Sequence, residues 1–130
     1  MSASRVSATV DALFDMVVSG RAPVGEALPA EAALARTLDV SRLTLREAVR
    51  VLTGRGVLRP VHGRGTFVNP PGRWTDLGSI VALRSRTSSW SEIAGQLVEI
   101  RRMIEVGSAG LAAERRSRTD VDRLGRDLED

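Results

Sequence analysis

The sequence contains no cysteine and only one histidine, His62. Without cysteine the chain has neither disulfides nor thiolate ligands, and one histidine cannot complete a zinc site by itself. All nineteen basic residues are arginine, so the glycine-rich stretches 54–56 and 62–65 lack the lysine of a phosphate-binding P-loop. No nucleophile–base pair, metal cluster or cofactor loop is found either, and the protein is not expected to be an enzyme or to hold a cofactor.

Long apolar runs are also missing. No stretch of about 18 apolar residues occurs, so no membrane-spanning helix or membrane partner is expected. The first residues, MSASRVSATVDALF, lack the basic-then-apolar layout of a secretion signal. Together these absences predict a cytoplasmic protein.

Positive charge is concentrated in the first half of the chain. Residues 1–73 contain ten arginines and six acidic residues, whereas residues 74–130 contain nine arginines and ten acidic residues. Residues 42–64 alone have six arginines and one glutamate, a net charge of +5. This asymmetry is typical of a nucleic-acid-binding domain joined to a module with another task.

Two helices and a tight turn are predicted over residues 29–54. Glu31 follows Pro29 at the start of a short helix, Asp39 lies in the turn, and Ser41 begins a longer helix. The longer helix has apolar residues at i, i+3, i+4 and i+7, which predicts one buried stripe of Leu45, Ala48, Val49 and Leu52. Three arginines, Arg42, Arg46 and Arg50, follow at intervals of four on a different face.

A β-hairpin is predicted after these helices. Residues 57–58 and 66–68 have the composition of short strands, and residues 62–65 form a glycine-containing turn between them. An earlier helix over residues 4–19 has an apolar face that would close a small core. These elements predict an α+β fold, a winged helix-turn-helix over residues 1–69.

In order and spacing, these motifs resemble the amino-terminal domain of the GntR family of bacterial transcription regulators. The resemblance runs from Gly25 through LPAE, VSRLTLREAV and GVL to HGRGTFV. It implies a DNA-binding transcription regulator, a repressor, that binds a palindromic operator in double-stranded DNA as a homodimer.

Arg42 and Arg46 are the main candidates for contact with operator bases or phosphates. They lie in the first turn of the second helix and one turn later, where a helix-turn-helix reaches bases. By resemblance, Ser41 and Thr44 supply hydroxyl groups to the DNA backbone, although Ser41 is equally well explained as a helix cap. Arg50 lies a further turn along, and both DNA contact and simple solvation remain open for it. Leu43 replaces a polar residue of some members, so the base preference is expected to differ from theirs.

The predicted hairpin turn supplies the other candidates, His62, Gly63 and Arg64. Arg64 would meet strong negative potential in a minor groove. The glycines of the turn are also explained by turn geometry alone, and the two interpretations are compatible.

Residues 70–73 are predicted to be a linker, and residues 74–130 to be helical. A short segment at 75–83 precedes a helix over 92–116, capped by Ser91 or a neighbour, and a last helix capped by Thr119. Both later helices have apolar stripes that two helices cannot cover, which predicts an incomplete all-helical bundle that self-associates or is loosely ordered.

The second half is similar to the opening helices of the FCD effector domain in the FadR-like branch of the family. The similarity lies in Glu99, Arg101, Ile104-Glu105 and Leu111-Ala112-Ala113. It implies a domain that binds a small carboxylate effector, often through a metal held by Asp and His. Because those ligands are absent here, a divalent metal and an effector response are expected only in a complete effector domain. Arg101 is the one candidate effector-binding residue, and surface placement is the simpler interpretation.

The alternative function is a winged-helix protein-interaction module with a helical dimerisation tail. Such a module would present apolar residues on the second helix where this chain has three arginines.

Overall fold

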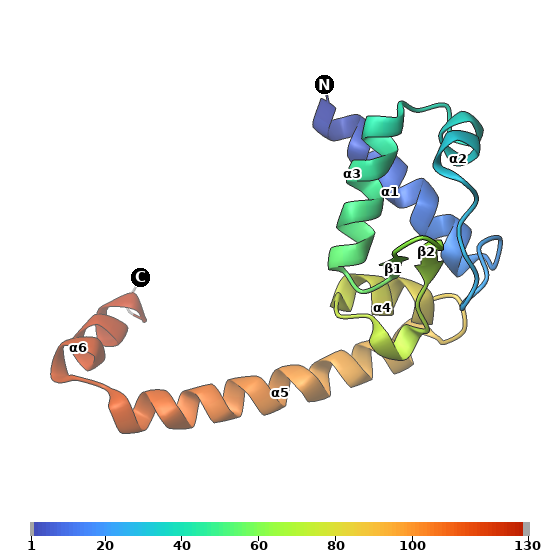
Figure 1. The fold of residues 1–130 in the computed structure, drawn as a ribbon. Coiled ribbons are helices and arrows are strands. Elements are labelled where there is room, and N and C mark those ends of the chain that lie inside the picture. Colours follow the sequence, from blue (N-terminus) through green and yellow to red (C-terminus); the bar gives the residue numbers. More distant parts are fainter. Residues whose placement is uncertain (1, 129–130) are drawn as a thin grey trace. The chain divides into compact units, whose positions relative to one another are not determined.

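The structure is a computed structural model that describes residues 2–128, and side-chain environments from residue 5 onward. The chain divides into two compact units, Met1–Thr87 and Ser88–Asp130. We call the first unit the head. The head contains α1 (Ser2–Val18), α2 (Glu31–Thr37), α3 (Arg42–Gly54), β1 (Leu58–Val61), β2 (Gly65–Val68), a 3-10 helix η1 (Pro71–Arg73) and α4 (Leu77–Arg84) (Figure 1). The second unit contains α5 (Trp90–Arg115) and α6 (Arg118–Asp127).

A core between α1, α2 and α3 holds the head together. The predicted stripe of α3 is confirmed, because Leu45, Ala48 and Leu52 are fully enclosed and Val49 is partly buried beside them. Their main partners come from the other helices and the hairpin: Val10, Leu13, Val17, Leu34, Ala35, Val57, Leu58 and Val68. Burying a side chain of this size contributes about 1.5–3 kcal/mol. The core therefore fixes which face of α3 remains in solvent.

The turn between α2 and α3 forms where it was predicted. Asp39 has a φ of 50°, a left-handed conformation that Asp tolerates better than most residues. Ser41 caps α3, and its Oγ accepts a hydrogen bond from the backbone N–H of Thr44 at 3.0 Å. The structural role expected for Ser41 is confirmed.

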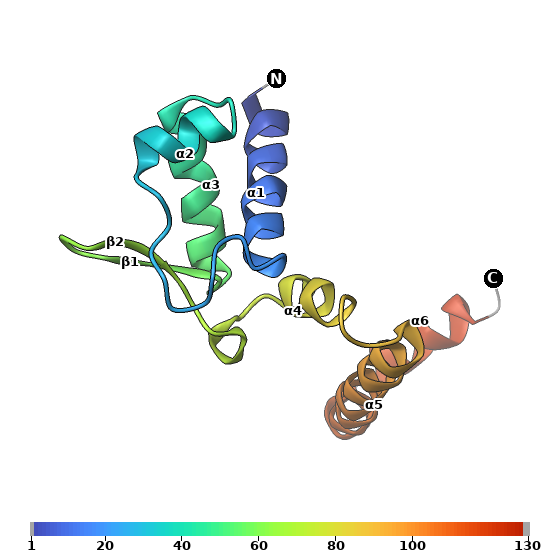
Figure 2. The same cartoon turned by 90° about the vertical axis from the view of Figure 1, so that its right-hand side faces the viewer.

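The hairpin is an antiparallel pair that extends beyond the core. In the register, Leu58 is opposite Val68 and Arg59 is opposite Phe67. The segment before α2 adds backbone hydrogen bonds to β2, including Leu28 N–H to the Thr66 carbonyl at 2.7 Å. Figure 2 shows the hairpin projecting from the head on the side of α3 opposite to α1.

The head extends beyond the boundary expected at residue 69. The predicted linker, residues 70–73, contains η1, and Trp74 after it is 6% exposed. The Trp74 ring packs against Phe14 of α1 with centroids 5.7 Å apart, and its Nε1–H donates to the Asn69 carbonyl at 3.1 Å. The prolines end β2 as expected, but the indole after them provides a large apolar surface, and packing on α1 removes it from water.

Two further features hold residues 73–87 on the head. Gly56 has a φ of +74°, and a Cβ there would lie 2.6 Å from the Arg73 carbonyl oxygen, so only glycine allows this approach. Asp15 of α1 forms salt bridges with Arg21 and with Arg86, which follows α4.

The helix α4 begins at the cap Asp76. The Asp76 carboxylate accepts hydrogen bonds from the hydroxyl and the backbone N–H of Ser79, and these hydrogen bonds lower the pKa of Asp76.

The helices of the second unit begin at serines that form reciprocal capping boxes. Ser89, not Ser91, caps α5 together with Glu92. Ser117 caps α6 together with Asp120, so the predicted cap at Thr119 is wrong and Thr119 lies inside the helix. Ser117 has a carboxylate three residues later that returns its hydrogen bond, which stabilises the helix start.

Most apolar side chains of α5 and α6 are exposed, but Ile93 near the start of α5 is buried at 3% exposure. The exposed ones include Val98, Ile100, Met103, Ile104, Val106, Leu111, Val121, Leu124 and Leu128. In the part of the chain that the structure describes, no helix is both long and apolar enough to cross a membrane.

Candidate nucleic-acid interface

The solvent face of α3 carries arginines at its start and middle. Arg42, Arg46 and Arg50 are all exposed, whereas the opposite face lies in the core. Thr44, in the same first turn as Arg42, is half-buried, and its Oγ1 is 2.8 Å from the Oγ of Ser41. The predicted base-contacting and hydroxyl-bearing residues of the helix are therefore brought together at the amino-terminal end of α3.

Arg46 is paired with an acidic residue of the preceding helix. Its Nε lies 2.9 Å from Oε2 of Glu31, which stands in the first turn of α2. The two side chains are 65% and 51% exposed, and such exposed pairs contribute only about 0–1 kcal/mol to stability. The contact uses Nε–H, so it orients the guanidinium while its two terminal NH₂ groups stay available to a ligand. From the sequence, Glu31 was predicted only to lie at the start of a helix. The sequence does not show that it forms a salt bridge with Arg46.

Arg50 is paired within its own helix, with Glu47 at 3.0 Å. This pair reduces the local positive charge two turns along α3. For Arg42, no carboxylate of residues 2–128 lies within salt-bridge distance. The uncompensated charge on α3 is therefore greatest at its first turn.

The hairpin turn presents the other candidates in solvent. His62, Gly63 and Arg64 are all exposed. Gly63 and Gly65 have φ values of +70° and +105°. The glycines therefore provide the turn geometry that the first of the two interpretations predicted. The Arg64 side chain between these glycines is exposed to solvent.

Phe67 holds two arginines on the hairpin. The guanidinium carbons of Arg59 and Arg64 lie 5.3 and 5.5 Å from the centre of its ring. Cation–π contacts at exposed sites contribute about 0.5–1 kcal/mol each, enough to bias where a flexible side chain lies. Arg59 was not among the predicted site residues. Only the register, which places it opposite Phe67, reveals it.

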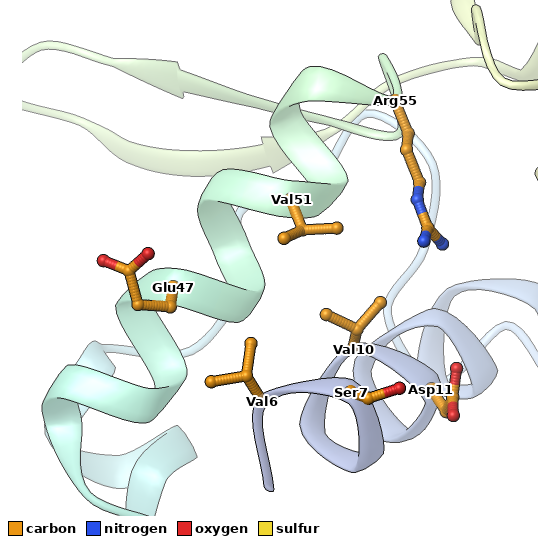
Figure 3. A pocket seen from close by; sticks show the side chains of 7 residues that line it. All are labelled: Val6, Ser7, Val10, Asp11, Glu47, Val51 and Arg55. Atoms are coloured by element: carbon orange, nitrogen blue, oxygen red, sulfur yellow. The ribbon is translucent and has the colours of Figure 1, made fainter. Parts of the chain in front are cut away.

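The head also has a groove between α1 and α3. Figure 3 shows valines of both helices, Val6, Val10 and Val51, facing this groove, with Ser7 and charged residues around them. Its charged residues are Asp11, Glu47 and Arg55. Two carboxylates against one guanidinium make the groove unsuitable for a small carboxylate effector.

Arg101 lies on α5 with its side chain 75% exposed, and its Nε pairs with Oε1 of Glu105, one turn later, at 2.6 Å. It is not among the residues that line the hollow on α5, which are Glu99, Arg102, Met103 and Val106. Within the residues that the structure describes, no three metal-ligating side chains come together.

A three-helix core that presents a capped, arginine-bearing helix beside an arginine-bearing hairpin defines the winged helix-turn-helix class of DNA-binding domains. Comparison with known proteins identifies the family. Residues 5–68 match the bacterial regulatory proteins of the gntR family, and this part of the chain is a GntR-family winged helix-turn-helix domain.

Individual relatives agree with this assignment. The chain is 33% identical over 110 residues to the HTH-type transcriptional regulator LutR of Bacillus subtilis strain 168, covering 84% of this chain and 48% of LutR. It is 34% identical over 98 residues to the Glc operon transcriptional activator of Escherichia coli K12, covering 75% of this chain and 37% of the activator. A solved structure of Streptococcus agalactiae GntR has a TM-score of 0.50 at 32% identity, covering 93% of this chain and 56% of that one. The chain thus spans about half or less of the length of these two curated relatives.

Proposed function

We propose that this chain is a sequence-specific, DNA-binding transcription regulator that binds a palindromic operator as a homodimer and acts as a repressor. One observation carries the proposal: the head presents Arg42 and Arg46 on α3 and Arg64 on the hairpin as exposed groups of one compact unit. A rigid head of this kind can place a helix in a major groove and a hairpin beside it.

The two arginine groups would act in different ways. On α3, Arg42 and Arg46 form bidentate hydrogen bonds to guanine edges or to phosphates in the major groove. On the hairpin, Arg64 lies in or beside the minor groove, and Arg59 pairs with the phosphates along it. Each neutralised phosphate releases counterions, which drives binding. This task requires no catalytic group, and we propose none.

The second unit supplies dimerisation in this proposal. Its exposed stripes on α5 and α6 are apolar, and a second copy of the chain would cover them. Response to a small carboxylate, with or without a divalent metal, belongs to a complete effector domain. Arg101 is retained as its candidate contact. DNA binding also implies a cytoplasmic protein.

The alternative, a protein-interaction module, has one observation in its favour. Leu43 on α3 is 71% exposed. However, Leu43 is a single apolar side chain among arginines, whereas a docking face for a protein requires a contiguous apolar patch. DNA remains the better partner for this surface.

Selection of binding sites from randomised duplex DNA tests the proposed function. We expect enrichment of one two-fold symmetric sequence, bound at least about 10³-fold more tightly than random DNA at physiological salt. Circular dichroism on the same preparation would verify that the chain is folded. A folded chain that enriches no sequence would contradict the proposal, and an asymmetric site would contradict the dimer.

Changing Arg46 to Ala is expected to weaken operator binding by about 1–3 kcal/mol if it contacts a base. The thermal midpoint should not change, because Arg46 is exposed and lies off the buried stripe. Fluorescence anisotropy with the selected operator and with random DNA measures the effect. An equal loss on both would assign Arg46 to a phosphate, and unchanged affinity would remove it from the site.

Arg101→Ala is the matched control for this substitution. Like Arg46, Arg101 is an exposed arginine paired with a glutamate through Nε. Its removal costs one positive charge and one ion pair but should leave operator affinity within twofold of the wild type.

A further inference from the structure

Leu43 is the largest exposed apolar side chain on α3, and the core does not explain its position. It is 71% exposed, in the first turn of the helix. At about 100° per residue, Leu43 points away from the buried stripe of Leu45, Ala48 and Leu52, into the face that holds Arg46 and Arg50. An exposed apolar side chain therefore lies at the edge of the surface that carries the arginines, in the first turn of α3.

Isolated exposed leucines are common and need no explanation by themselves. Leu43 differs because of its neighbours. It directly follows Arg42 and lies two residues after the cap Ser41, at the end of the helix that a helix-turn-helix inserts toward base edges. In the proposed complex, whatever base lies opposite the first turn of α3 would contact Leu43.

The chemistry of the major groove limits what this base can be. In the major groove guanine presents two acceptors, adenine an acceptor and a donor, and cytosine a donor, whereas thymine presents an acceptor and a C5-methyl group. Leucine has no hydrogen-bonding group, so placing it on a polar edge would strip water from that edge without replacement. Contact with a methyl group removes apolar surface from water on both sides.

We infer that Leu43 is a specificity-determining residue that selects thymine through its C5-methyl group at one position of each operator half-site. This inference rests on the proposed function and adds to it one base of the recognition sequence. Arg42 and Arg46 beside it then discriminate neighbouring base pairs or hold the backbone, while Leu43 reads the one apolar group in the groove.

Replacing thymine by deoxyuridine tests this inference, because the change removes only the methyl group and keeps the base pair. Each thymine of the selected operator is replaced in turn, and binding of the wild type and of Leu43→Ala is measured by fluorescence anisotropy. We expect one thymine per half-site at which uracil weakens wild-type binding about fourfold, and about 15-fold when both half-sites are changed. Leu43→Ala should bind the thymine and uracil operators equally well.

A second arm adds the methyl group back. Cytosine at the same position should bind weakly, and 5-methylcytosine should recover part of the loss with the wild type but not with Leu43→Ala. Leu77→Ala is the control variant, since Leu77 is another exposed leucine of the head, on α4, at 53% exposure. It should retain the full preference for thymine. Because Leu43 is exposed, its alanine variant should also retain the wild-type melting temperature.

The outcomes separate this inference from the proposed function. Tight wild-type binding that no uracil substitution weakens would overturn the role of Leu43 and leave the regulator intact. Equal sensitivity of the wild type and Leu43→Ala would do the same, because another group would then contact the methyl. Failure to select any operator would overturn both.

Discussion

Operator affinity is expected to fall about 10³-fold when the salt concentration rises from 50 to 200 mM. Arg42, Arg59 and Arg64 are exposed, and none has a carboxylate of the described residues within salt-bridge distance. If each meets one phosphate, the two heads of a dimer neutralise about six, and the logarithm of affinity falls with that of salt with a slope of about −5. Arg46 and Arg50 would contribute less, because their charge is partly compensated by Glu31 and Glu47.

Dissociation constants at four salt concentrations give this slope directly. Arg64→Gln should reduce its magnitude by about two in the dimer, since one phosphate contact is lost from each head. Arg101→Gln, which removes the same charge from the second unit, should leave the slope unchanged. Affinity that does not respond to salt would show that phosphate contacts do not drive binding, and the role of the arginine surface would fail.

Changing Trp74 to Ala is expected to lower the free energy of unfolding of the head by about 3–5 kcal/mol. The side chain is 6% exposed and packs on Phe14 at 5.7 Å between ring centroids. Its removal leaves a cavity between α1 and the segment after β2, and it also removes the hydrogen bond to the Asn69 carbonyl. Urea denaturation followed by circular dichroism measures the loss.

Trp90→Ala is the matched control, because Trp90 is the other tryptophan of the chain and is 68% exposed. Its substitution should change the free energy by no more than about 0.5 kcal/mol. If the two variants were equally stable, Trp74 would not belong to the core of the head. The boundary expected at residue 69 from the prolines would then be the better one.

Local chemistry determined much of the head. The apolar spacing of α3, the turn at Asp39 and the cap at Ser41 each depend on residues no more than a few positions apart, and all three were predicted. Glycines at positions with positive φ marked the hairpin turn for the same reason. Where two local signals competed, prediction was weaker: Ser117 and Thr119 are both good caps, and the reciprocal hydrogen bonds with Asp120 decided for Ser117.

Tertiary structure decided how these elements meet, because packing brings together residues that are distant in the chain. Glu31 reaches Arg46 only because α2 crosses near α3, and Arg59 joins Arg64 on Phe67 only because the strands pair in one register. Burial of Trp74, packing of Ile80 and Leu83 on the core and the salt bridge of Arg86 likewise join the residues after the linker prolines to the head, as far as Thr87. Sequence periodicity shows which face of an element is apolar, but the surface that will cover it comes from elsewhere in the fold.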